Sequence, residues 1–99
     1  MNKESIISVL RNIYDPEIPV NIYDLGLIYN ITIDEANNIS ILMTVTAPNC
    51  PVADVLPEEV RQAVLSLEGV KTVDVQITFD PPWTPDNLSD EARLELGLL

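Results

Sequence analysis

Two neighbouring stretches in which every second residue is apolar most constrain how this chain folds. The first stretch contains Leu27, Tyr29, Ile31 and Ile33, and the second contains Ile39, Ile41, Met43 and Val45. Successive side chains of a β-strand point to opposite faces, so both stretches predict half-buried strands. The Asn-rich turn over residues 35–38 predicts that they form a hairpin. One face of the return strand is apolar and the other mostly hydroxyl, so other elements have to cover only one sheet face.

Apolar residues at helical spacing predict the covering elements. One set is Ile6, Ile7, Leu10 and Tyr14, which predicts a helix from about Lys3 that ends before Asp15, where Pro16 disfavours helical geometry. The other set is Leu56, Val60, Ala63, Val64 and Leu67, and Gly69 stands in the position of its C-terminal cap. Pro57 leaves two starts open for this long helix: one near Leu56, and one with an earlier turn from Pro51.

A third strand and a short final helix complete the pattern. The strand alternates through Val73, Val75, Ile77 and Phe79 and ends at the prolines that follow Asp80. Ser89, followed by two acidic residues, predicts the start of the last helix. We therefore expect one α+β domain over residues 1–99, ordered α-β-β-α-β-α, with helices on one face of a three-stranded sheet. The pattern leaves the strand order open.

Composition excludes several classes of function. Five basic and sixteen acidic residues give a net charge of −11, which argues against nucleic acid and membrane surfaces as partners and leaves room for a partner with a basic face. The apolar runs are too short to span a bilayer, and the first residues do not have the features of a secretory signal. A single cysteine cannot form an intrachain disulfide, so nothing in the sequence requires an oxidising compartment. We therefore expect a soluble cytoplasmic protein.

The residues that are absent also limit the chemistry. The chain contains no histidine, so a Cys-His nucleophile pair and histidine metal ligands are excluded. It has three glycines and no phosphate-binding loop motif, which argues against a nucleotide site. We expect a protein that is not an enzyme.

Cys50 is the strongest candidate functional residue. It lies in residues 46–51, TAPNCP, between the predicted return strand and the long helix. A lone cysteine is more commonly a buried, inert side chain. Cys50, however, has proline neighbours and lies in a loop next to a helix N-terminus, which favours the thiolate form. These features indicate a functional thiol.

Three further residues are weaker candidates when taken singly. Asp15 and Glu17 form a carboxylate pair around Pro16, and a solvated loop that ends a helix would explain them equally well. Thr46 is at least a strand-end hydroxyl that bonds a local N–H. Gly26 is expected to adopt a turn conformation that other residues avoid. Trp83 is expected to pack as a lid and not to serve as a binding platform.

A metal site within one chain would lack ligands. Cys50 is one thiolate, and zinc or iron–sulfur sites usually use several thiolates or imidazoles. Any iron or iron–sulfur cluster would therefore be labile and shared with a second chain, as in a homodimer, or with a partner, and none would be held within a monomer.

Three segments of this chain resemble the iron–sulfur maturation factors of the SufT type, the metal–sulfur cluster biosynthesis family. They are residues 15–29 (DPEIPVNIYDLGLIY), residues 46–51 (TAPNCP), and residues 80–85 (DPPWTP) with residues 89–99. They occur in the family's order and span nearly the whole chain. The resemblance implies a small pocket of Asp15, Glu17, Thr46 and Cys50.

The resemblance also implies a role and partners. The role is that of an accessory factor that assembles iron–sulfur clusters or delivers them to apo-proteins, beside scaffold and carrier proteins. The same domain is similar to PaaD proteins, which carry a further cysteine-bearing extension, and to the N-terminal part of Mrp-type ATPases. A separate P-loop ATPase is thus an expected partner.

Two other hypotheses remain. The first is a metal-free adaptor that links maturation proteins through its loops, the region of Trp83 and its exposed strand face. The second is an enzyme that uses Cys50 as a redox or transfer thiol, which would need a base that the chain does not obviously contain.

Overall fold

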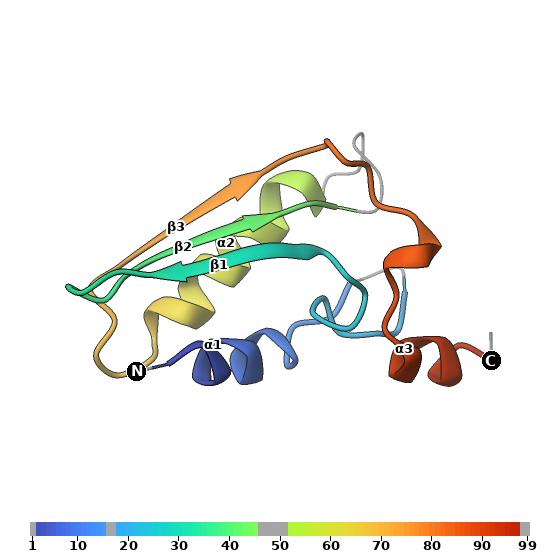
Figure 1. The fold of residues 1–99 in the computed structure, drawn as a ribbon, viewed down its shortest axis with the longest axis horizontal. Helices are drawn as coiled ribbons and strands as arrows, with labels where there is room; N and C mark the ends of the chain where they lie inside the picture. Colours follow the sequence, from blue (N-terminus) through green and yellow to red (C-terminus); the bar gives the residue numbers. More distant parts are fainter. Residues whose placement is uncertain (1, 16–17, 46–51, 98–99) are drawn as a thin grey trace.

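The computed structural model describes residues 2–15, 18–45 and 52–97, and for residues 52–54 it describes the backbone alone. The elements are α1 (Lys3–Leu10), β1 (Ile28–Ile33), β2 (Asn38–Met43), α2 (Val52–Leu65), β3 (Thr72–Ile77), a 3-10 turn (Pro85–Asn87) and α3 (Asp90–Glu95). This order confirms the predicted α-β-β-α-β-α arrangement and the α+β class (Figure 1).

The sheet is mixed, with the strand order β1-β2-β3. The β1–β2 hairpin is antiparallel, and β3 lies parallel to β2 after the crossover through α2. This settles the strand order that the sequence pattern left open. Because β2 and β3 are parallel, both end at the same end of the sheet, and α2 begins there (Figure 1).

One face of the sheet is buried, as predicted. Ile39, Ile41 and Met43 of β2 are almost fully buried, whereas Ser40 on the opposite face is exposed. The helices α1 and α2 both lie on the buried side (Figure 1). Their contributions to the core are Ile6 and Leu10 from α1 and Leu56, Val60 and Val64 from α2. Burial of these aliphatic side chains is the main stabilising contribution to the two layers.

The first helix is shorter than its apolar spacing predicts. It ends at Leu10, with Arg11 as its C-cap, and Tyr14 is 58% exposed instead of continuing the buried stripe. The backbone after the helix pairs with a later segment: Ile22 N–H donates to the carbonyl of Ile13 at 2.8 Å, and Tyr14 forms an isolated antiparallel bridge with Asn21. This non-local pairing, invisible in the helical spacing, holds the chain extended before Pro16.

The second helix begins at Val52, so the earlier of the two predicted starts is the one observed, and Pro57 lies inside the helix. The helix ends at Leu65, before the predicted cap. Gly69 instead stands in a following turn, where its φ of 92° is one that glycine adopts without strain and Val70 N–H donates to the carbonyl of Leu67. In the part of the chain that the structure describes, no helix is long and apolar enough to cross a membrane.

Candidate functional site

Four residues form the sequence-predicted site, and the described part of it lies toward one end of the sheet, where β2 and β3 end and α2 begins. Of the four, Asp15 is described, whereas Glu17, Thr46 and Cys50 lie outside the described residues. The segment after α1, which carries Asp15, extends toward this same end (Figure 1). The order of elements therefore brings the Asp15 segment to the end of the sheet at which β2 leads toward α2.

Asp15 is a buried carboxylate and not part of a solvated loop. Its relative exposure is 6%, and its Oδ1 accepts a hydrogen bond from the backbone N–H of Ile18 at 3.1 Å. Its own N–H lies 3.4 Å from the carbonyl oxygen of Val20, to which it donates. The bond from Ile18 orients the Asp15 carboxylate, and the bond to Val20 fixes the backbone that carries it. Burial of a carboxylate requires such compensation.

The loop that follows Asp15 is closed by its own side chains. Asn21 Nδ2 donates to Asp24 Oδ2 at 2.8 Å, and Asp24 N–H donates to Asn21 Oδ1 at 2.9 Å. The guanidinium of Arg11 lies 3.9 Å from Asp24 Oδ1 and 5.1 Å from the centre of the Tyr23 ring. The loop is therefore fastened to the end of α1, where a cation is favourable because of the helix dipole.

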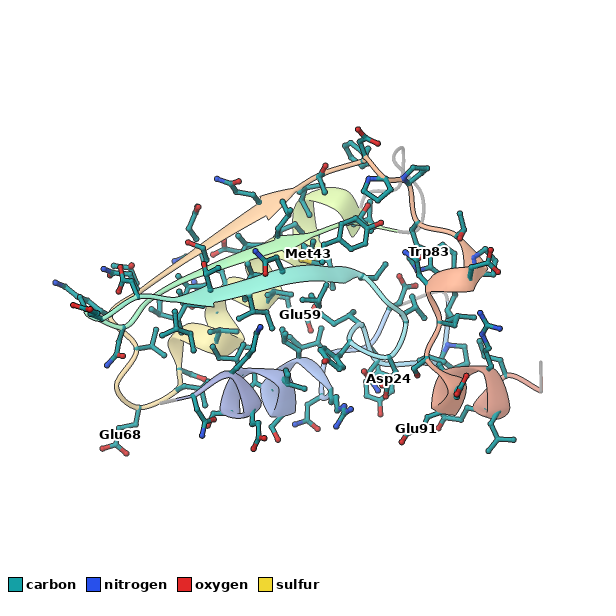
Figure 2. The ribbon with its side chains drawn as sticks, viewed as in Figure 1. Asp24, Met43, Glu59, Glu68, Trp83 and Glu91 are labelled. Carbon is teal, nitrogen blue, oxygen red and sulfur yellow. The ribbon has the colours of Figure 1, made fainter. Side chains whose placement is uncertain are left out.

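The C-terminal segment crosses this loop and holds it from the other side. Trp83 Nε1 donates to the carbonyl of Leu25 at 2.6 Å, and Ser89 N–H donates to the carbonyl of Asp24 at 2.9 Å. Figure 2 shows Trp83 on the segment after β3, beside the loop that carries Asp24. The indole packs against the core, which confirms the lid role predicted for Trp83.

The close approach of the two segments depends on Gly26. Its φ is 82°, which confirms the turn conformation predicted for it. A Cβ at Gly26 would lie 2.7 Å from the Cβ of Asn87 and still closer to its backbone oxygen. The sequence pattern does not indicate that Asn87 is the residue packed against Gly26.

Tyr29 is an anchor that the sequence pattern did not single out. Its hydroxyl donates to the carbonyl of Pro81 at 2.8 Å. The register of β1 against β2 shifts between Ile28 and Asn30, so Tyr29 is the extra residue of a β-bulge. In the sequence the only signal is an uninterrupted apolar run, Leu27-Ile28-Tyr29, where alternation is expected.

Replacing Trp83 with phenylalanine is expected to lower the free energy of unfolding by about 1 kcal/mol, because the variant keeps an aromatic ring and loses one hydrogen bond to a buried carbonyl. Urea unfolding followed by circular dichroism measures this difference. Leu94→Ala, which removes a 68% exposed side chain from α3, serves as the control and should stay within about 0.5 kcal/mol of wild type. A Trp83→Phe variant as stable as wild type would show that the indole N–H does not fasten the loop.

The described residues do not by themselves form a metal site. Among residues 2–15, 18–45 and 52–97, no three carboxylate or thiol side chains are grouped so that they could hold a metal ion. Asp15 is the one sequence-predicted site residue in these ranges, and it contributes a single carboxylate.

The chain belongs to the family of iron–sulfur cluster assembly proteins, whose family model matches residues 3–77. The match runs from the start of α1 to the end of β3 and thus includes the whole sheet. This confirms the resemblance to the maturation factors that the three sequence segments indicated.

Individual relatives are similar over nearly the full chain. The Fe-S protein maturation auxiliary factor of Porphyromonas gingivalis is 54% identical over 97 residues, which is 98% of this chain and 92% of that protein. The Fe-S protein maturation auxiliary factor YitW of Bacillus subtilis is 41% identical over 97% of this chain and 94% of its own length. A crystal structure of a domain of unknown function from Bacillus anthracis superposes with a TM-score of 0.90 at 33% identity and covers 98% of this chain and 92% of that chain.

Longer proteins contain a similar domain, as the resemblance implied. A putative component of the 1,2-phenylacetyl-CoA epoxidase of Escherichia coli is 37% identical over 92% of this chain, which spans 54% of that protein. The iron-sulfur cluster carrier protein of Synechocystis is 29% identical over 83% of this chain, which spans 23% of that protein.

Proposed function

We propose that this protein is a non-enzymatic accessory factor that assembles iron–sulfur clusters or delivers them to apo-proteins, with Cys50 as the thiolate that contacts iron. The observation that carries the proposal is the 54% identity, over 98% of the chain, to a protein named Fe-S protein maturation auxiliary factor. The family match over residues 3–77 supports the same role.

The positions of α2 and Asp15 support Cys50 as the acting thiol. The helix α2 begins at Val52, two residues after Cys50 in the sequence. The first turn of a helix presents free N–H groups and a positive dipole end, which favour a thiolate over a thiol. Asp15, buried and oriented at the same end of the sheet, supplies a carboxylate that orients the thiol or adds an oxygen ligand, together with Glu17 and Thr46.

The cluster is cargo, and one chain holds it incompletely. The chain has one cysteine and no histidine, so Cys50 supplies one thiolate and the remaining thiolate ligands come from a second chain or from the protein that gives or takes the cluster. Incomplete ligation suits transfer, because a cluster with partner ligands exchanges more readily than one enclosed by four thiolates. The partners are scaffold proteins, carrier proteins and apo-iron–sulfur proteins, and a separate P-loop ATPase of the carrier type is a candidate among them.

Anaerobic reconstitution with iron and sulfide tests this function. We expect wild type to show cluster absorption in the visible range, with iron and sulfide bound per pair of chains and a dimeric mass. Cys50→Ala should remain a metal-free monomer, because it lacks its one thiolate ligand.

The reconstitution also decides between a carrier and an adaptor. If wild type and Cys50→Ala are identical metal-free monomers that both still bind scaffold proteins, then the protein is a metal-free adaptor and Cys50 is not a ligand. A cluster that forms equally in both proteins would contradict Cys50 as the acting thiol.

A further inference from the structure

Exposed apolar side chains gather at the end of the molecule where β2 and β3 end. The described residues expose four large hydrophobic side chains, and three of them, Tyr14, Val55 and Phe79, lie on segments directed toward this end. Val55 is in the first turns of α2 and is 64% exposed, and Phe79 follows β3 and is 50% exposed. The start of α2, the end of β3 and the segment after α1 all lie toward this end of the fold (Figure 1).

The backbone that carries the two aromatic side chains is held by hydrogen bonds. On either side of Phe79, Thr78 N–H donates to the carbonyl of Met43 at 2.9 Å, and Asp80 N–H donates to Thr78 Oγ1 at 3.2 Å. Tyr14 lies in the bridge to Asn21 described above. An exposed aromatic residue on a fixed backbone loses little freedom on binding, which is the property of an interface anchor.

The charge around these side chains is acidic. Glu59 lies one helical turn after Val55 and is exposed, and Asp80 follows Phe79 and is exposed. The nearest cation on α2 is Arg61, whose Nη2 forms an ion pair with Glu58 Oε1 at 2.7 Å. The same contact lowers the pKa of Glu58 to about 2.

Three of the other described cations are paired or lie at the opposite end of the fold, and the fourth, Arg93, bonds the carbonyl of Asp86 at 3.2 Å. Arg11 lies against Asp24 and the Tyr23 ring. Lys3 starts α1 and Lys71 precedes β3, which places both at the opposite end of the fold, and Arg93 is on α3. Together with a net charge of −11, this arrangement makes the end acidic and disfavours a second copy of the chain as its occupant when no cluster joins the two chains.

We propose that Tyr14, Val55 and Phe79, with Glu59 and Asp80 beside them, form the surface, here called the end face, on which the cluster-exchanging partner protein docks. The partner's contact surface is apolar at its centre and carries Lys and Arg at its rim. The inference rests on the proposed function, because it identifies the chemistry of the protein that exchanges the cluster at the same end of the fold. Apolar anchors supply affinity, and the acidic side chains speed encounter with a basic face.

Binding measurements with purified proteins test the end face. The probes are the iron–sulfur scaffold, the cluster carrier protein and one apo-iron–sulfur enzyme of the same cell, each titrated against the full chain by biolayer interferometry. For at least one probe we expect Phe79→Ser and Val55→Ser to weaken binding by ~10-fold or more. Glu59→Lys should slow association and flatten its dependence on salt, because it removes attraction to a basic face.

Matched control variants separate the end face from general effects. Leu94→Ser removes an equally exposed leucine from α3, and Glu68→Lys makes the same charge change as Glu59→Lys at the opposite end of the molecule (Figure 2). Both should bind within about twofold of wild type. Circular dichroism and unfolding of each variant confirm that it is folded.

Each result supports or overturns the docking proposal. End-face variants that bind like wild type, controls that lose as much affinity, or a wild type that binds none of the probes all overturn it. Dimerisation of the cluster-free protein that Phe79→Ser abolishes would assign the face to a second copy and also overturn it. Cys50→Ala, in contrast, should bind the same probe normally and fail only in cluster transfer, so a failure of the docking proposal is distinguishable from a failure of the proposed function.

Discussion

Gly26→Ala is expected to lower the free energy of unfolding by about 3 kcal/mol, since a positive φ costs a non-glycine residue roughly 1–2 kcal/mol and a forced clash costs about as much again. The clash is with the backbone oxygen and the Cβ of Asn87, and neither can move without separating the C-terminal segment from the loop. For a domain of this size the midpoint of thermal unfolding should fall by roughly 12–20 °C. Thermal unfolding followed by circular dichroism measures it.

Gly69→Ala is the matched control for the Gly26 prediction. Gly69 also has a positive φ, 92°, but a Cβ there would meet nothing within 4 Å. This variant should cost about 1 kcal/mol, from the backbone conformation alone. Equal losses for the two variants would show that the contact with Asn87 contributes nothing beyond the positive φ.

From the proposed function we expect Cys50→Ala, as the sole copy in cells, to lower the activity of target enzymes, because alanine removes the chain's one thiolate, the proposed contact to iron. The variant should still fold. The elements that flank residues 46–51 are held by contacts of their own: β2 lies between β1 and β3, and α2 is buried through Leu56, Val60 and Val64. The measurement is the activity of an iron–sulfur enzyme in a strain that lacks the wild-type protein.

Two comparisons make the Cys50 result interpretable. The unfolding midpoint of purified Cys50→Ala should lie within a few degrees of wild type, which excludes loss through misfolding. Leu94→Ala in the same strain should support full enzyme activity, because Leu94 is exposed on α3. Normal activity with Cys50→Ala would contradict the assignment of Cys50 as the acting thiol.

Local patterns predicted the elements well because the physical causes are local. The strands follow from alternation that buries one sheet face, as Ile39, Ile41 and Met43 show. Ser89 marks the start of α3 because its side chain accepts a hydrogen bond from Ala92 N–H, a cap three residues away in the sequence. These features depend on neighbours within a few positions, so the sequence indicates them directly.

The end of α1 shows where local patterns fail. Helical spacing extends to Tyr14, but the chain leaves the helix after Leu10 to pair with residues 20–22. The burial of Asp15 likewise depends on Ile18 and Val20, which the loop has to fold back to reach. The carboxylate motif therefore marked Asp15 as a candidate without deciding between a solvated and a buried side chain.

By itself the sequence determined the class of fold, because periodicity is a property of neighbouring residues, and its short motifs indicated the family. The pocket of Asp15, Glu17, Thr46 and Cys50 is implied by that resemblance and stays a prediction. Only the tertiary structure decided that the sheet is mixed and that Tyr29 forms a bulge. It also decided that Trp83 holds the loop through a hydrogen bond to Leu25, from which it is 58 residues apart in the sequence. The physical reason is that such contacts form between segments whose separation along the chain carries no periodic signal. Their energies come from packing and hydrogen bonds that exist only once both layers are in place.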